Sequence, residues 1–106
     1  MNGPIVIVQT TFGSENDAEA AAGQLIDARL AACAQISALS SIYRWQGAVQ
    51  TEKEWRVDLK TTVARKEDLK KALAALHPYE EPEILVIEVN DTSDGYAAWV
   101  ISETDG

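Results

Sequence analysis

The sequence predicts an α+β domain in which strands and helices follow the order βαββαβ. Segments rich in β-branched residues alternate with stretches in which apolar residues recur every three or four positions, as on one face of a helix. The chain has 106 residues, which is close to the usual size of one domain and too short for two ordinary cores. We therefore expect residues 1–106 to form a single domain.

The first third of the chain predicts a strand followed by an amphipathic helix. Residues 4–11 are dominated by β-branched side chains, and Ser14 stands where a helix N-cap is expected. From residue 17 to residue 30, apolar residues such as Leu25 and Ile26 recur at helical spacing while polar residues fall largely on other faces. We expect one face of this helix to pack on the sheet.

The middle of the chain predicts a long β-hairpin. Residues 42–45 and 48–63 alternate between apolar and polar side chains, and Gln46-Gly47 between them marks a turn. If most of residues 34–63 form this hairpin, each arm would run roughly 40 to 50 Å, which is longer than a domain of this size can cover. The hairpin tip should therefore protrude.

The last third predicts a helix, a strand and a short final helix. Leu69, Leu73 and their neighbours form an apolar stripe over residues 66–76, and Pro78 disfavours helical geometry at His77, so the helix should end there. Residues 84–89 read as a strand, and residues 93–102 as a short helix that carries Tyr96 and Trp99.

This order of elements is that of the ferredoxin-like split βαββαβ sandwich, in which two helices cover one face of a four-stranded antiparallel sheet. The other face is left bare, yet residues 5–8 and 84–87 are apolar at both parities of the strand. Copies of the chain that pack sheet against sheet and pair their strand edges would cover this surface. The sequence therefore predicts a homo-oligomer.

Composition excludes several classes of function. Nine Lys and Arg against seventeen Asp and Glu give a net charge of −8, which repels nucleic acids and anionic membranes. No signal peptide or transmembrane stretch is visible at the N-terminus, which predicts a cytoplasmic location. Cys33 is the only cysteine, so no disulfide forms within the chain. Phosphate loops, nucleophile elbows and HExxH pairs are absent from the sequence, so we do not expect an enzyme.

The least ordinary segment is residues 77–83, HPYEEPE, because two prolines stiffen a link that carries the only histidine and three carboxylates. The His77 imidazole and the carboxylate of Glu80 or Glu81 are acceptable ligands for a divalent metal, and Cys33 is a softer candidate if the fold brings it near. The alternative is that the segment only joins a helix to a strand, with Tyr79 packed over the sheet edge, and that Cys33 is a buried, unreactive thiol.

Aromatic and charged residues offer a second kind of site. Five aromatic side chains could line a cleft between subunits or simply pack in a core or interface: Tyr43, Trp45, Trp55, Tyr96 and Trp99. Glu54 and Lys60 lie on the polar parity of the long third strand, where they could form an ordinary cross-strand ion pair or bind an anionic ligand. A hydrolase that uses Glu54, His77 or Tyr79 is the least favoured reading, because no activated nucleophile accompanies them.

Four separated motifs resemble the CutA divalent-cation tolerance proteins in order and spacing: residues 29–34 (RLAACA), 41–47 (SIYRWQG), 59–61 (LKT) and 77–83 (HPYEEPE). The resemblance covers nearly the whole chain. It implies a ferredoxin-like fold, a tight homotrimer, kinship with the trimeric PII signalling proteins and a link to copper or other divalent-cation tolerance. Some members are thought to bind copper through a cysteine in the first strand and a His-His pair before Pro-Tyr; here Gln9 and Leu76 stand at two of those positions, and His77 remains.

The resemblance also implies a cleft between subunits lined by the family landmarks Cys33, Trp45, Glu54, Lys60, His77, Tyr79, Glu80 and Trp99. Our first hypothesis is a trimeric cytosolic metal-binding protein for divalent-cation (copper) tolerance, with His77, Glu80 and Cys33 as weak ligands. The second is a PII-like signalling or small-ligand module without a metal role, in which Lys60 and its aromatic neighbours bind an anionic metabolite.

Overall fold

The computed structural model describes residues 4–105, so both predicted domain limits, residues 1 and 106, lie outside the described residues. The α+β class is confirmed. The elements follow the predicted order: β1 (Ile5–Phe12), α1 (Glu15–Asp27), β2 (Cys33–Trp45), β3 (Ala48–Thr62), α2 (Lys66–Leu76), β4 (Leu85–Glu88) and α3 (Asp94–Thr104). Among residues 4–105, no helix is long and apolar enough to cross a membrane.

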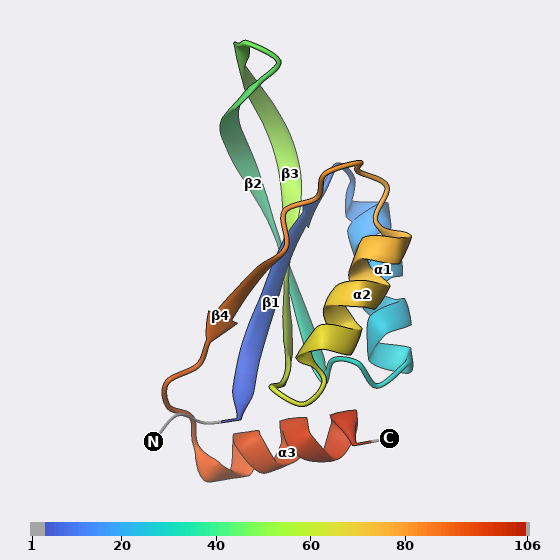
Figure 1. Cartoon of the computed structure of the whole chain (residues 1–106), viewed down its shortest axis with the longest axis vertical. Coiled ribbons are helices and arrows are strands. Elements are labelled where there is room, and N and C mark those ends of the chain that lie inside the picture. Colours follow the sequence, from blue (N-terminus) through green and yellow to red (C-terminus); the bar gives the residue numbers. More distant parts are fainter. Residues whose placement is uncertain (1–3, 106) are drawn as a thin grey trace.

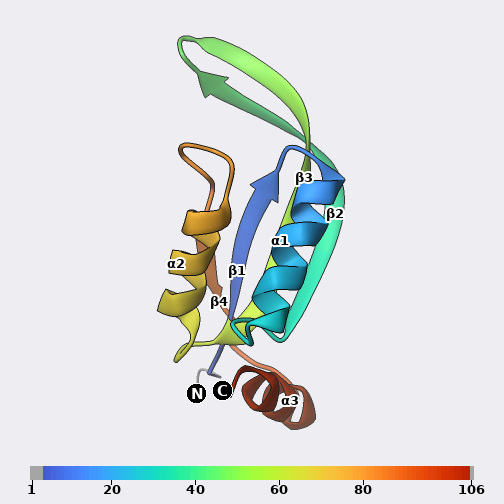
Figure 2. The same ribbon diagram turned by 90° about the vertical axis from the view of Figure 1, so that its right-hand side faces the viewer.

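The four strands form one antiparallel sheet in the order β2-β3-β1-β4. Helices α1 and α2 lie side by side over one face of this sheet (Figure 2). Their small and aliphatic side chains, including Leu25 and Leu73, pack against Val8, Phe12 and Leu59 of the strands. Burial of this apolar surface is the main force that holds the two layers together.

The hairpin of β2 and β3 extends beyond the rest of the sheet, as predicted (Figure 1). Its pairing runs from Cys33 opposite Lys60 to Trp45 opposite Ala48, whereas β1 ends at Phe12, opposite Trp55. From Glu54 to the turn, β3 therefore pairs with β2 alone and no longer with β1. This protruding part of the hairpin contributes to the longest dimension of the chain, which is 45 Å.

The turn at the hairpin tip is made by Gln46 and Gly47, which both have positive φ, at 49° and 80°. Two consecutive residues with positive φ are the signature of a type I′ turn, whose twist matches that of the two strands. Gln46 is the unusual member of the pair, because glycine and asparagine are the residues that normally occupy this region.

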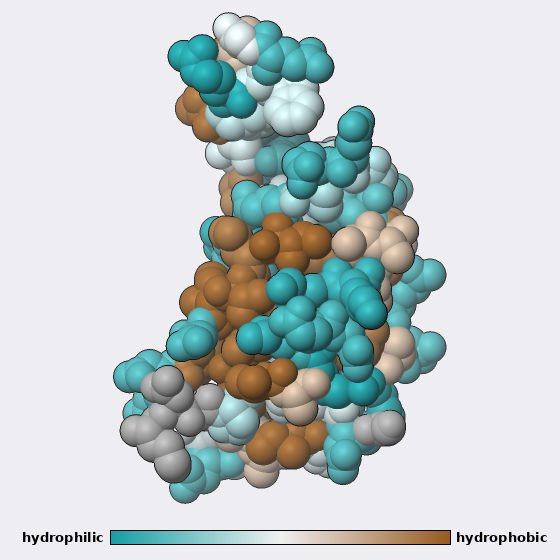
Figure 3. Space-filling model, in the orientation of Figure 1, coloured by the Kyte–Doolittle hydropathy of each residue, from teal (hydrophilic) through white to brown (hydrophobic). Residues whose placement is uncertain are grey.

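Helix α3 lies across the end of the sheet away from the hairpin tip (Figure 1). It packs against β3, and its Val100 and Thr104 side chains are buried. The rest of the face opposite α1 and α2 stays open, and Leu85 and Ile87 of β4 are 50% and 42% exposed there. Figure 3 shows a hydrophobic area around β4.

Several predicted element limits, including both limits of β1, were displaced by one to three residues. Helix α1 ends at Asp27 rather than residue 30, because Arg29 takes a left-handed φ of 60°. The Arg29 N–H donates a hydrogen bond to the Ile26 carbonyl, and the Leu30 N–H donates one to the Leu25 carbonyl. These two bonds are the Schellman arrangement that terminates helices. Strand β4 is shorter than predicted and α3 continues to Thr104.

Candidate functional site

Residues from four segments meet just beyond the end of β1, at the base of the protruding hairpin. Helix α2 ends at Leu76, and the next residue, His77, already has an extended backbone, as expected before Pro78. The imidazole ring stacks on Phe12, the last residue of β1, with ring centroids 4.3 Å apart and planes 13° apart. His77 is consequently only 8% exposed.

Both ring nitrogens of His77 are used inside the chain. Nε2 lies 2.8 Å from the Thr11 carbonyl oxygen, which can only accept a hydrogen bond, and Nδ1 lies 3.1 Å from the Tyr79 backbone N–H, which can only donate one. The ring is therefore the neutral tautomer with its proton on Nε2. Neither nitrogen has a free lone pair for a metal ion.

Tyr79 continues this network to β3. Its hydroxyl donates a hydrogen bond of 3.0 Å to Oε2 of Glu54, a carboxylate that is itself only 8% exposed. Gly13 leaves room for the phenol, because a Cβ at that position would lie 3.1 Å from the Tyr79 hydroxyl oxygen. Burial, followed by the hydrogen bond to Glu54, raises the pKa of Tyr79 well above its usual value, so the phenol remains neutral and keeps donating.

A second tyrosine–carboxylate pair lies next to the first on the hairpin. The Tyr43 hydroxyl donates to Oε1 of Glu52 at 2.5 Å, and this bond raises the pKa of Tyr43 to about 12. Trp45, near the hairpin tip, is 51% exposed. The protruding hairpin and its base thus present two carboxylates, each with a phenol as its hydrogen-bond donor.

A separate cluster lies under α3 on the open face of the sheet. The Lys60 Nζ bonds to Gln35 Oε1 at 2.5 Å and lies 6.0 Å from the centre of the Tyr96 ring. Burial raises the pKa of Tyr96, and the neighbouring Cys33 raises it further. Cys33 lies opposite Lys60 on the adjacent strand, which places its thiol in this cluster. The Trp99 ring lies 5.7 Å from that of Tyr96.

The predicted site residues therefore divide into two separate groups within one chain, one at the hairpin base and one under α3. His77, Tyr79 and Glu54 meet at the hairpin base, whereas Lys60 and Cys33 meet under α3. Trp99 belongs with the second group through Tyr96, Glu80 is exposed on the loop after α2, and Trp45 lies far out on the hairpin.

The three predicted metal ligands do not come together within one chain. Cys33 lies opposite Lys60 of β3. Thr11, whose carbonyl bonds to His77, lies opposite Arg56 of the same strand. Lys60 and Arg56 are four positions apart, which separates the two sites by about 13 Å along β3. No group of three or more His, Cys, Asp or Glu side chains in residues 4–105 could hold a metal ion.

Sequence reasoning missed three contributors to the hairpin-base site: Phe12, Gly13 and Thr11. The glycine directly after a predicted strand was a usable signal, because a missing Cβ often marks a close approach by another group. The ring stacking and the carbonyl contact had no such signal, since they depend on how far β1 extends along β3.

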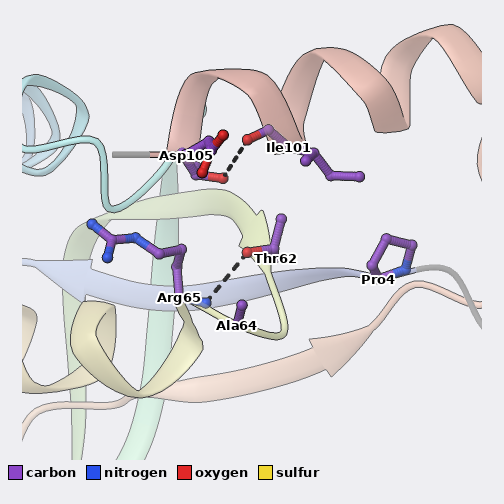
Figure 4. Close-up of a pocket in the computed structure, with 7 residues that line it drawn as sticks. Pro4, Thr62, Ala64, Arg65, Ile101 and Asp105 are labelled. Atoms are coloured by element: carbon purple, nitrogen blue, oxygen red, sulfur yellow. Dashed lines mark hydrogen bonds between the residues drawn. The ribbon is translucent and has the colours of Figure 1, made fainter.

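One hollow on the chain lies away from both groups. A cavity of about 440 Å³ is lined by Pro4, Thr62, Ala64, Arg65, Ile101, Thr104 and Asp105. Figure 4 shows these residues between α3 and the turn that leads from β3 into α2. It includes none of the residues predicted for the metal site or the cleft.

Comparisons with known proteins agree with the resemblance noted in the sequence. A family model described as CutA1 divalent ion tolerance protein matches residues 6–103. The divalent-cation tolerance protein CutA of Pyrococcus horikoshii is 38% identical over 100 residues, which are 94% of this chain and 98% of that protein. The CutA of Thermus thermophilus is 39% identical over 99 residues, with 92% and 96% covered. The structure of CutA from Synechococcus elongatus matches with a TM-score of 0.95 at 35% identity, over 99% of this chain and 95% of that one.

Proposed function

The chain belongs to the CutA1 divalent ion tolerance protein family, and from this membership we propose that it serves divalent-cation tolerance as a cytosolic homotrimer that binds a divalent cation, such as copper, between its subunits. The observation that carries the proposal is the family match over residues 6–103, together with relatives named for divalent-cation tolerance. Two features of the chain support the finer parts.

The exposed apolar surface supports assembly. Ile42, Val49 and Trp45 on the protruding hairpin are 71%, 64% and 51% exposed, and the open face of the sheet adds Leu85 and Ile87. Large exposed apolar side chains on a long hairpin that projects beyond the sheet mark a surface that a partner covers. Copies of the same chain are the occupant that the homotrimer proposal requires.

The separation of the candidate ligands supports a cation site that only the assembly completes. Glu80 is exposed and Cys33 is partly exposed, so both are accessible from a neighbouring chain, whereas the His77 nitrogens are engaged internally. A cation held by groups from different copies would depend on assembly. Because each chain supplies few ligands, we also predict weak binding, with a Kd in the micromolar range or higher.

The test combines a binding titration with control of the assembly state. Calorimetric titration of Zn²⁺, and separately of Cu²⁺, into the wild-type protein should give saturable heat, and Glu80→Gln or Cys33→Ser should weaken it. Ile42→Asp, which places a charge on the proposed interface, should yield smaller particles by light scattering and lose the heat. Absence of binding by the wild-type protein would contradict the cation role, and unchanged binding by the dissociated variant would exclude a site between subunits.

A second candidate function is supported by Lys60. In residues 4–105 no carboxylate lies within 4.0 Å of its ammonium group, whose neighbours are the Gln35 amide and the Tyr96 ring. An amine without a counter-charge beside an aromatic ring can bind an anionic metabolite, as in a PII-like sensor. A thermal-shift screen of nucleotides and organic acids tests this function: a true ligand raises the Tm by several degrees in the wild type and not in Lys60→Gln. A flat screen would contradict it.

A further inference from the structure

We propose that His77 is a positioning residue: its Nδ1 holds the backbone of Tyr79 so that the Tyr79 hydroxyl stays on the buried carboxylate of Glu54. This role goes beyond cation tolerance, because it assigns the only histidine of the chain to the internal geometry of the hairpin base instead of to metal ligation. It does not depend on which ligand the assembled protein takes.

The first part of the inference is that the His77 ring is fixed on every side. Phe12 stacks on its face at 4.3 Å, and the Thr11 carbonyl accepts the Nε2 proton at 2.8 Å. Pro78 restricts the backbone that follows. Nδ1 is therefore presented at one position, where it accepts the N–H of the residue two places further along the chain, at 3.1 Å.

The second part is that Tyr79 has one further anchor, and this anchor is Glu54. The phenol passes over Gly13, where any side chain would meet the hydroxyl at 3.1 Å, and donates to Glu54 at 3.0 Å. A carboxylate that is 8% exposed needs donors to offset its lost hydration. One chain of hydrogen bonds thus joins four residues: Thr11 of β1, His77 and Tyr79 of the segment after α2, and Glu54 of β3.

The consequence is that a metal ion could reach Nδ1 only by displacing the Tyr79 N–H, which would release the phenol from Glu54. In the arrangement described, His77 acts on the hairpin base through Tyr79. This disagrees with a ligand role for His77 and leaves Glu80 and Cys33 as the candidate ligands of the proposed function.

Two amide variants separate the two nitrogens. In His77→Asn the side-chain oxygen takes the place of Nδ1 and can accept the Tyr79 N–H as an Asx turn, whereas in His77→Gln the amide nitrogen takes the place of Nε2 and can only replace the donor to Thr11. Both variants lose the ring stacked on Phe12, so they are matched for that loss. The readouts, by NMR on the assembled protein, are the exchange rate of the Tyr79 amide proton and the ¹³Cζ shift of Tyr79, which reports the hydrogen bond of its hydroxyl.

The expected result is that His77→Asn keeps both Tyr79 signals near their wild-type values. In His77→Gln, amide exchange should accelerate about fivefold or more, and the ¹³Cζ shift should move toward that of Glu54→Ala, in which the acceptor is gone. Equal Tyr79 signals in the two amide variants would overturn the proposal. A wild-type measurement also decides it without any substitution, because long-range ¹H–¹⁵N spectra must show the His77 proton on Nε2; a proton on Nδ1 would refute the role.

Discussion

Thr10 and Thr61 are two fully buried threonines on neighbouring strands, and they differ in one respect. The Thr61 hydroxyl donates to the Leu30 carbonyl at 2.7 Å, whereas the Thr10 hydroxyl has no hydrogen-bond partner within residues 4–105. A buried hydroxyl without a hydrogen bond costs stability, and one that satisfies a carbonyl contributes to it. The two positions are therefore matched tests of the same chemistry.

Thr10→Val is expected to raise the free energy of unfolding by about 1 kcal/mol, because it removes a hydroxyl that has lost water and gained no partner. Thr61→Val should lower it by about 1 to 2 kcal/mol, because the Leu30 carbonyl then loses a donor. Urea denaturation of both variants measures the difference. Equal changes of the same sign in the two variants would contradict this account of the core.

Tyr43 on the protruding hairpin and Tyr79 at its base predict how stability depends on alkaline pH. The folded chain keeps Tyr43 protonated up to a pKa of about 12, and the pKa of Tyr79 is raised as well, whereas an unfolded chain releases these protons near the ordinary tyrosine pKa of about 10. Above about pH 10 the unfolded state thus binds fewer protons than the folded one, and stability falls as pH rises.

Glu52→Gln tests the cause of the Tyr43 shift. Loss of the charged acceptor should bring the pKa of Tyr43 down toward 10.0, because the hydrogen bond to Glu52 is the largest contribution to the shift. The difference in phenolate absorbance between this variant and the same variant with Tyr43→Phe isolates that residue from the other two tyrosines. An unchanged midpoint would show that Glu52 does not hold the proton.

Single residues of the site were identified from the sequence, but their partners were not. His77, Tyr79 and Glu54 were each named as candidates, and the stiff link of residues 77–83 explained why they could be held still. That they share one hydrogen-bonded chain depends on β1 ending at Phe12 opposite Trp55. This register is set by long-range pairing, which residue patterns along one segment do not contain.

At the scale of secondary-structure elements, the end of α1 is the place where a local rule was broken. Arg29 occupies the left-handed position after the helix, at φ 60°, where glycine is preferred. Its guanidinium reaches the Glu103 carbonyl of α3 at 3.3 Å. A bulky residue in this conformation carries backbone strain, and in this chain it links α1 to α3.

Substitution of Arg29 separates the strain from the link. Arg29→Ala loses the contact with α3 and keeps the strained backbone, whereas Arg29→Gly loses the same contact and relieves the strain. The glycine variant should therefore be more stable than the alanine variant by about 1 kcal/mol. Thermal unfolding of both proteins provides the comparison, and an alanine variant at least as stable as the glycine variant would contradict it.

The helices and strands themselves were largely predictable, because most of them combine a regular spacing of apolar residues with a residue that ends the element. The limits of α2 matched the structure, since the apolar stripe and Pro78 agree on where the helix ends. The end of α1 was displaced because the apolar pattern continues through Leu30, whose N–H already belongs to the helix cap. The spacing of apolar residues alone does not distinguish the last turn of a helix from a C-terminal cap that places an apolar residue such as Leu30 at the next position.

At the scale of the whole molecule, the main feature is the distance between the candidate ligands in one chain. The resemblance implies a cleft between subunits that Cys33 and His77 both line, and the pairing of β1 and β2 with β3 keeps these two residues apart within a single chain. Sequence could not supply that register, because the hairpin pairs residues that are far apart in sequence. The exposed hairpin and open sheet face are compatible with a cleft that forms only when copies assemble.

The central claim, that a divalent cation is held between copies of this chain, is tested most directly by a crystal structure of the copper-soaked protein with anomalous data at the copper edge. We predict an anomalous peak at a subunit boundary with ligands from at least two chains, Glu80 or Cys33 among them, and with His77 still bonded to Thr11 and Tyr79. A well-ordered assembly without a peak, or a peak coordinated by His77 within one chain, would contradict the claim.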